Sequence, residues 1–391
     1  MSASAGGGSI SQCQGTFSIE RFENLSTLGT GAFGSAFHVR DVIDQSEWAL
    51  KVSSVADPKV RAAALSEAAI LHTLSNPHVV DIRAHWEEGS KVCILLELCR
   101  GSLSGIIKEA RDKCMYLCES FIVRMFMQLC TGVSYVHSSG ILHRDIKSAN
   151  ILWQQGSSGE LIIKLADFGI SRHLGDGSVA HTFIGSPFSL SPEILNGSAY
   201  NSKSDMWACG CVLYELCALG NPFGGKNPSL GSIVSSIFTG SYPPLHAMYS
   251  PELNELISAL FTLDPAQRPD VQHVLSLPIF SKYTASDSKI FSDIMWTPPE
   301  RLSATSESTI THEAGWGTLP AELSLSGGSL LNATRIPAVP SLYDTLVPVA
   351  PSLYDTLVPV APPRPPSSAG ANPFTAMAAA LRATQQQFAK K

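Results

Sequence analysis

Two short polar motifs in the middle of the chain restrict its fold and chemistry most: HRDIKSAN at 143–150 and DFG at 167–169. They place two carboxylates, Asp145 and Asp167, close in sequence to Lys147 and the amide of Asn150. Carboxylate and amide oxygens bind Mg²⁺ together with phosphate oxygens, and a positioned carboxylate can accept a proton from a hydroxyl. The motifs therefore indicate phosphoryl-transfer chemistry, with Asp145 near the proton and Asn150 and Asp167 on the metal.

A glycine-rich segment and a lysine precede these motifs. Gly29, Gly31 and Gly34 form the pattern GxGxxG, and the residues on both sides alternate as strands do. A strand followed by a helix would instead indicate a dinucleotide-binding turn, so two strands favour a flap over phosphates. Lys51 by itself is typical of a solvated edge strand. The motifs downstream favour a buried lysine paired with phosphates and with Glu67.

Apolar patterning divides the chain into a packed region and a tail. Residues 1–16 are rich in Gly, Ser and Ala and predict a flexible leader, whereas residues 17–283 predict one globular unit. Within this unit we expect strands at 22–28, 34–40, 46–52, 79–86 and 91–98, and helices at 60–74, 119–137 and 205–219.

The tail is rich in Ser, Thr, Pro and Ala. The unit PSLYDTLVPVA at 340–350 recurs at 351–361, and its prolines oppose helix and sheet, so residues 284–371 predict a linker. The YDTL segments and PPRPP at 362–366 also match peptide-ligand patterns, which leaves tail-binding proteins as an alternative. Residues 372–391 are compatible with one short, marginal helix.

Composition argues against several classes of partner. The net charge is −6 without a basic block, which gives no indication of nucleic acid. The 9 cysteines include no CxxC pair, so a zinc site is not expected. The sequence has neither a long apolar run nor a secretion signal, so we expect no membrane span. Free thiols then point to a cytoplasmic location, with cytoskeletal association left open.

Taken together, the motifs resemble those of the eukaryotic protein kinases over roughly residues 22–283, and among them the NIMA-related (Nek) serine/threonine kinases. The Nek resemblance rests on HRDIKSAN and on LSPE at 190–193, NSKSDMWACGCVLYELC at 201–217 and GSYPPL at 240–245. It implies an α+β fold of two lobes, followed by a mostly disordered tail. The N-lobe, at about 17–98, is small and β-rich with one regulatory helix, and the C-lobe, at about 99–283, is larger and helical.

The resemblance also implies a reaction and its residues. The γ-phosphoryl group of ATP, bound with Mg²⁺ between the lobes, would pass to Ser or Thr hydroxyls of protein substrates. Catalytic roles fall on Asp145, Lys147, Lys51 and Glu67, and metal binding on Asn150 and Asp167. The implied ATP-binding residues are Leu28, Gly29, Gly31, Gly34, Ala36, Ala49, Lys51, Leu96, Glu97, Cys99 and Leu152.

Structural and regulatory roles follow from the same resemblance. Glu193 is expected to pair with Arg268, and Asp205 to bind the backbone near the HRD motif.

Arg144 next to the catalytic Asp is expected to bind a phosphate on Thr182, which would order the activation loop. The alternative is that Thr182 is an exposed loop hydroxyl. Ser186 stands where threonine is usual in the family, and its hydroxyl can still reach Asp145 and Lys147.

A second function from a different class stays open. A pseudokinase would keep the fold and act as a scaffold through its tail. The presence of Lys51, Glu67, Asp145, Asn150 and Asp167 together favours an active enzyme over this alternative.

Overall fold

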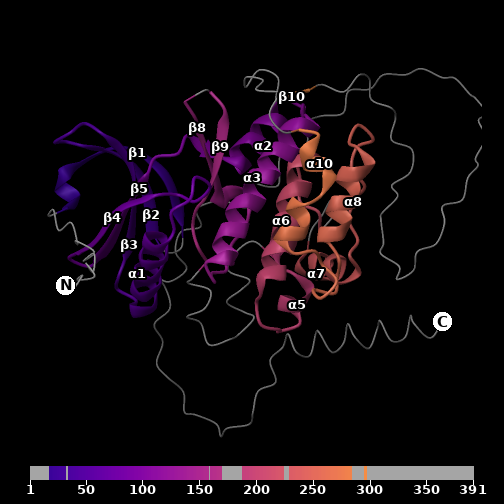
Figure 1. The fold of residues 1–391 in the computed structure, drawn as a ribbon. Coiled ribbons are helices and arrows are strands. Elements are labelled where there is room, and N and C mark those ends of the chain that lie inside the picture. Colours follow the sequence, from indigo (N-terminus) through magenta and orange to yellow (C-terminus); the bar gives the residue numbers. More distant parts are fainter. Residues whose placement is uncertain are drawn as a thin grey trace, which may run out of the picture. The chain divides into compact units, whose positions relative to one another are not determined.

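The computed structural model describes residues 17–31, 34–157, 159–169, 187–223, 229–283 and 295–296. The chain divides into the units 1–312 and 313–391, and all described residues lie in the first. They form a β-rich N-lobe followed by a helical C-lobe, as expected from the sequence (Figure 1). The leader, the repeats and the C-terminal helix predicted from the sequence lie outside the described residues.

The N-lobe is built on a five-stranded antiparallel sheet. Its strands are β1 (Phe22–Gly31), β2 (Gly34–Asp41), β3 (Glu47–Ser54), β4 (Ile82–Glu88) and β5 (Lys91–Glu97), in the order β1-β2-β3-β5-β4, and the 3-10 turn η1 (Ile19–Arg21) precedes them. Strand β4 begins at Ile82, three residues later than the predicted strand at 79–86. Val80 N–H donates to Leu165 O of the C-lobe at 2.9 Å, and Val79 also bridges to Leu165, so this pair joins the lobes instead of starting β4.

Helix α1 (Pro58–Thr73) packs against the β3, β4 and β5 part of this sheet. It begins earlier than the predicted residue 60 because the Asp57 carboxylate accepts a hydrogen bond from Lys59 N at 2.8 Å and Pro58 fits the first helical position. Small residues, Ala64 and Ala68, face the sheet, which brings the helix close enough for Glu67 to reach β3.

The C-lobe combines helices with short strands. The strands are β6 (Gly101–Ser102), β8 (Ile151–Gln155) and β9 (Leu161–Leu165), which form a sheet in the order β6-β8-β9, and β7 (Tyr116–Leu117), which pairs with β10 (Met295–Trp296). The helices are α2 (Leu103–Asp112), α3 (Glu119–Ser138), α5 (Pro192–Leu195), α6 (Ser202–Ala218), α7 (Leu230–Thr239), α8 (Pro251–Leu260), α9 (Val271–Leu275) and α10 (Pro278–Ser281), with 3-10 turns η2 (Ser148–Asn150) and η4 (Pro187–Ser189).

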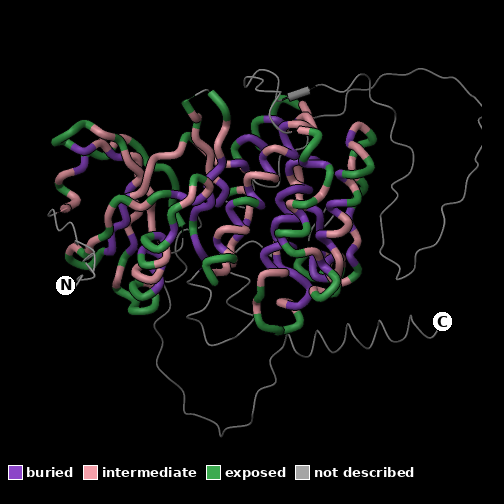
Figure 2. Tube along the Cα trace, viewed as in Figure 1, coloured by how far each residue is buried: buried purple, intermediate pink, exposed green. Residues whose placement is uncertain are grey.

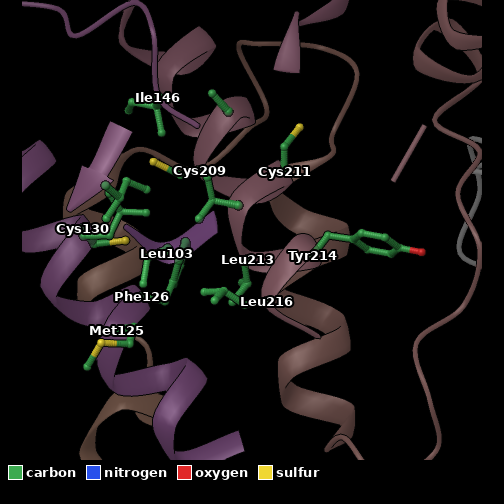
Figure 3. Close-up of a cluster of buried hydrophobic side chains, with 14 of the residues drawn as sticks. Leu103, Met125, Phe126, Cys130, Ile146, Cys209, Cys211, Leu213, Tyr214 and Leu216 are labelled. Atoms are coloured by element: carbon green, nitrogen blue, oxygen red, sulfur yellow. The ribbon is translucent and has the colours of Figure 1, made fainter. Parts of the chain in front are cut away.

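The core of the C-lobe lies along α3 and α6, where the buried positions concentrate (Figure 2). Helix α6 is apolar almost all round, so it can only be stable with neighbours on every side. Figure 3 shows Leu213 on the side of Phe126 of α3, whereas Tyr214 points away from that helix. This packing holds α6 in place, and with it Asp205, which lies in the first turn of the helix.

Candidate active site

Three charged side chains from distant parts of the chain meet at Lys51. Lys51 Nζ on β3 donates to Glu67 Oε1 and Oε2 of α1 at 2.8 and 2.9 Å, so the pair expected from the sequence is present. The same ammonium donates to Asp167 Oδ1 at 2.6 Å. Glu67 is nearly buried with 9% of its side chain exposed, whereas Asp167 is 53% exposed. The C-lobe carboxylate is thus held by the N-lobe and still faces solvent.

Within this group, Lys51 and Asp167 each favour the charged form of the other. Burial lowers the pKa of Lys51, but the carboxylates of Glu67 and Asp167 outweigh it and hold the pKa above its ordinary value. Burial raises the pKa of Asp167, and the Lys51 ammonium more than offsets this, so the Asp167 pKa lies below its ordinary value. Lys51 is therefore a cation and Asp167 an anion at neutral pH, the states that phosphate and metal binding require.

The HRD motif forms a second polar group around Asp145. Lys147 Nζ donates to Asp145 Oδ2 at 2.9 Å, and Asn150 Nδ2 donates to the same oxygen at 2.9 Å and to Asp145 O at 3.0 Å. Asn150 uses its amide hydrogens on Asp145, which turns its Oδ1 the other way. The motif therefore leaves an amide oxygen available as a ligand.

The two candidate metal ligands are held close along the backbone. Ala166 N–H, just before Asp167, donates to Asn150 O at 2.9 Å. Among the described residues, Asn150 Oδ1 and Asp167 Oδ2 accept no hydrogen bond. No group of three or more His, Cys, Asp or Glu there is arranged to hold a metal alone. This pair of oxygen donors fits Mg²⁺ that is also bound by phosphate oxygens.

Asp205, buried at the start of α6, supports the HRD turn as expected. Its Oδ2 and Oδ1 accept hydrogen bonds from the backbone N–H groups of His143 and Arg144, both at 3.0 Å. Burial raises the pKa of Asp205, but hydrogen bonds from His137 and Tyr200 and the charge of nearby histidines hold it below its ordinary value. An ionised carboxylate without solvent contact needs such donors, and it fixes the turn that precedes Asp145.

The face of the N-lobe sheet that carries Lys51 is partly apolar. Ala36 lies directly opposite Lys51 on β2, and Ala49 lies opposite Leu96 on β5, so these side chains share one face. All of them stay partly exposed, as does Leu152 on β8. Leu28 lies at an irregularity of the β1–β2 pairing and is 49% exposed.

The glycine-rich strands contain glycines of two kinds. Gly34 has a φ of +153°, and a Cβ there would lie 2.2 Å from Val52 O, so packing within the chain requires glycine. Gly29 shows no such need, because a Cβ would meet no described atom within 4 Å and its φ lies outside the left-handed range. Open space beside Gly29 is what a flap over a bound anion needs.

The expected support pair of the C-lobe is buried. Arg268 Nη1 and Nη2 donate to Glu193 Oε1 and Oε2 at 2.8 and 3.0 Å, and Ser204 Oγ donates to Glu193 Oε1 at 2.8 Å. Burial raises the pKa of Glu193, but the Arg268 guanidinium holds it below its ordinary value. The pair ties the segment after the activation loop to α6 and to the loop before α9.

Two predicted regulatory residues, Thr182 and Ser186, lie outside the described residues. Arg144, the predicted phosphate partner, is described: it has a positive φ of +67°, and its Cζ lies 5.9 Å from the centre of the Tyr200 ring.

Comparison with known proteins decides the family. The model of the protein kinase domain matches residues 22–280. The chain belongs to the protein kinase family. The two-lobed fold and the motifs from GxGxxG to DFG agree with this assignment. No helix in the described part of this kinase is long and apolar enough to cross a membrane.

Several similar relatives are Nek kinases, which confirms the resemblance expected from the sequence. Serine/threonine-protein kinase Nek1 of Mus musculus is 36% identical over 269 residues, which are 68% of this chain and 22% of that protein. Nek8 of Danio rerio is 35% identical over 68% of this chain and 38% of its own length. Nek11 of Homo sapiens is 34% identical over 70% of this chain and 42% of its own length. The chain thus spans less than half of each of these relatives.

The kinase also contains a polar junction that the sequence analysis missed. Glu97 is among the residues expected to bind ATP, and its side chain makes contacts of its own: Oε1 accepts Asp81 N–H at 2.7 Å and pairs with Lys164 Nζ at 2.6 Å. Its Oε2 accepts Gln154 Nε2 at 2.5 Å. The junction links the end of β5 to β8 and to β9, the strand before DFG. The sequence signal was an apolar strand interrupted by a lysine, at Lys164.

Cys99, two residues after Glu97, has main-chain groups that are open to a partner. Cys99 is half-buried, and among the described residues its backbone N–H and C=O have no backbone partner. Main-chain groups of this kind need a partner, which a bound base or water can supply.

Two further residues were not predicted from the sequence, because they contact Asp205 and belong to none of the motifs. His137 Nε2 of α3 lies 2.8 Å from Asp205 Oδ2, and Tyr200 OH donates to Asp205 Oδ1 at 2.6 Å. Tyr200 also lies beside Arg144, so one ring contacts both the buried carboxylate and the predicted phosphate-binding arginine.

Proposed function

We propose that this kinase transfers the γ-phosphoryl group of ATP to Ser and Thr hydroxyls of protein substrates. The observation that carries the proposal is the assembled charge set: Lys51 joins Glu67 to Asp167, while Asp145 is oriented by Lys147 and Asn150. A chain that had lost catalysis would have no need to keep both groups of side chains in this arrangement.

Each side chain then has a distinct task. Lys51, held in place by Glu67, binds phosphate oxygens of the nucleotide, and the apolar face with Ala36, Ala49 and Leu96 covers its base. Bound Mg²⁺, held by Asn150 and Asp167, would neutralise charge that develops on the phosphate oxygens.

At the second group, Asp145 accepts the proton of the substrate hydroxyl at Oδ1 or Oδ2. The Lys147 ammonium, 2.9 Å from Oδ2, holds this carboxylate in place and lies where it can reach a phosphate oxygen.

The test is incorporation of phosphate into a generic Ser/Thr substrate by the full chain with Mg²⁺. Asp145→Asn keeps the size of the side chain and removes the base, so the rate should fall by about 10²–10⁴-fold. Asp167→Ala should remove activity through the metal. Asp112→Asn, on the surface of α2, is the matched control and should keep the wild-type rate. Equal rates from wild type and Asp167→Ala would instead favour the pseudokinase scaffold.

We infer further that phosphate on Thr182 activates the kinase by pairing with Arg144. Arg144 directly precedes Asp145, so an ordered phosphate there would restrict the catalytic turn. Thr182→Ala should lower the rate strongly, and Thr239→Ala, on α7, should not. In an Arg144→Gln background, Thr182→Ala should add little further loss, because the two residues would act as one unit. A wild-type rate in Thr182→Ala would exclude this mode of activation.

The partners and the location of the kinase belong to the same proposal. Protein substrates follow from the proposed reaction, and the tail repeats are candidate sites for binding proteins. A cytoplasmic location agrees with the 8 described cysteines, all of which are free thiols.

A further inference from the structure

A strand from the tail pairs with the C-lobe. Met295 lies opposite Leu117, and Trp296 lies opposite Tyr116, in an antiparallel ladder between β10 and β7. Neighbouring positions of such a ladder alternate between hydrogen-bonded and non-bonded pairs, so Tyr116 or Leu117 exchanges backbone hydrogen bonds with the tail. In the described part of the chain β7 has no other strand partner. The strand β10 lies within residues 284–371, for which the sequence predicts a linker.

The receiving strand is firmly held from the C-lobe side. Leu117 is fully buried, and its carbonyl accepts the hydroxyl of Tyr249 at 3.0 Å. The Tyr116 ring packs against His246, with 5.2 Å between ring centres. The edge of β7 is therefore prearranged for a partner strand, which lowers the entropic cost of binding one.

The chain leaves the C-lobe close to this edge. Tyr283, the last residue before the connection, donates its hydroxyl to Glu119 Oε1 at 3.2 Å. Glu119 starts α3, two residues after Leu117, and its carboxylate also accepts Ser250 N–H at 2.7 Å and the Ser250 hydroxyl at 2.5 Å. Tyr283 and Met295, the described residues on either side of 284–294, thus both lie near the start of α3, so joining them within one chain costs little entropy.

The composition of the tail marks the same segment. KIFSDIMW at 289–296 is dense in large apolar residues, unlike the Ser- and Pro-rich sequence around it. Pro298 and Pro299 follow, and proline lacks the N–H that a longer ladder needs. The sequence therefore allows a short strand here and stops it shortly afterwards.

We propose that the edge of β7 is a strand-addition site that takes the segment around Met295–Trp296 of the same chain. The pairing tethers the chain that follows α10 to the C-lobe beside the N-terminus of α3. The partner recognised is an extended, apolar backbone segment, bound through main-chain hydrogen bonds.

Hydrogen–deuterium exchange of the full chain tests this tether. The double variant Met295→Pro/Trp296→Pro removes the ladder's backbone donor whichever of the two residues supplies it, whereas Ser288→Pro introduces a proline outside the ladder. Peptides that contain Tyr116–Leu117 should exchange faster in the double proline variant by on the order of fivefold, the worth of about one net hydrogen bond. Ser288→Pro should match wild type. Peptides from β9 should be unchanged in all three chains, which excludes general unfolding.

Two outcomes would overturn the proposal. Equal exchange at Tyr116–Leu117 in wild type and the double proline variant would mean that β10 does not occupy the edge. Protection in wild type that falls on dilution would assign the strand to a second copy instead of the same chain. Neither outcome bears on kinase activity, so the tether and the proposed reaction are tested separately.

Discussion

The two lobes each hold a carboxylate against a cation at almost the same distances, yet the two pairs differ in their surroundings. In the N-lobe, Lys51 lies 2.8 Å from Glu67 and also contacts Asp167, and its side chain is 23% exposed. In the C-lobe, Arg268 lies 2.8 Å from Glu193, with 0% and 6% of the side chains exposed.

The two ion pairs differ in which atoms accept the remaining hydrogens of the cation. Arg268 gives its other hydrogens to main-chain oxygens, of Thr262 at 3.0 Å and Lys203 at 2.7 Å, so the C-lobe pair is saturated by the protein. Lys51 gives its third hydrogen to Asp167, a half-exposed residue of the other lobe, where a bound phosphate can compete for it. A saturated pair stabilises the fold, and a partly open pair is available for chemistry.

The largest expected effect comes from breaking the saturated pair. Arg268→Ala leaves Glu193 buried without a cation and should lower the free energy of unfolding by about 3–5 kcal/mol. Urea denaturation measures it. Arg61→Ala, which breaks the exposed pair with Glu87, is the matched control and should change stability little. Equal losses from the two variants would contradict the assigned structural role.

Breaking the partly open pair of Lys51 and Glu67 should affect catalysis more than stability. Lys51→Met should lower the rate of phosphate transfer on the order of 10²–10³-fold, because a phosphate donor is lost. Its free energy of unfolding should fall less than that of Arg268→Ala, since burial already raises the pKa of Glu67 and helps it become neutral. Rate assays and urea denaturation on both variants measure the contrast. A larger stability loss in Lys51→Met would reverse it.

A third carboxyl, Glu215 of α6, forms no ion pair with another described residue, and its contribution to stability should depend on pH. Burial raises its pKa from 4.5 to about 7, against a hydrogen bond from Ser148 and the charge of Arg111. The unfolded state therefore ionises first, and this group costs the fold stability as pH rises from 4.5 to about 7.

Glu215→Gln removes that cost. The free energy of unfolding of the variant minus that of wild type should increase over this pH range and then level off. Urea denaturation across the range measures it. A difference that stays constant with pH would show that Glu215 titrates at its ordinary pKa.

The smallest expected effect comes from removing the N-terminal cap of α6, the helix next to the saturated pair. Asn201 caps α6 by accepting N–H groups of Lys203 and Ser204 at 2.9 and 3.3 Å. Asn201→Ala should cost about 1 kcal/mol in thermal or urea unfolding. Asn254→Ala, inside α8, loses no cap and should cost less. If both cost the same, the cap does not stabilise the start of α6.

The three longest helices and the strands of the N-lobe sheet were predictable because their signals are local. The Ala-rich pattern of α1 and the all-apolar pattern of α6 identify these helices without any partner. The start of β4 and the strand β10 were missed because they depend on pairing. Val79 and Val80 look like strand residues, but they bind Leu165 of the C-lobe instead.

The candidate site divides in the same way. Asp145, Asn150 and Asp167 belong to sequence motifs, so their roles can be predicted from the sequence. Lys164 and Tyr200 belong to no motif. Their roles depend on contacts that only the fold creates, of Lys164 with Glu97 and of Tyr200 with Asp205. A hydrogen bond between side chains of separate elements leaves no periodic trace along the chain.

By itself, the sequence determined the family, the order of the two lobes and the chemical type of each site residue, because motifs and apolar periods act over short stretches of chain. The tertiary structure decided which charges meet. Lys51 and Asp167 stand 116 positions apart, and only the packing of α1 on the sheet and of Val79–Val80 on β9 brings them to 2.6 Å. Packing also decided that one ion pair is saturated and the other open, since burial depends on the whole fold and not on the residue.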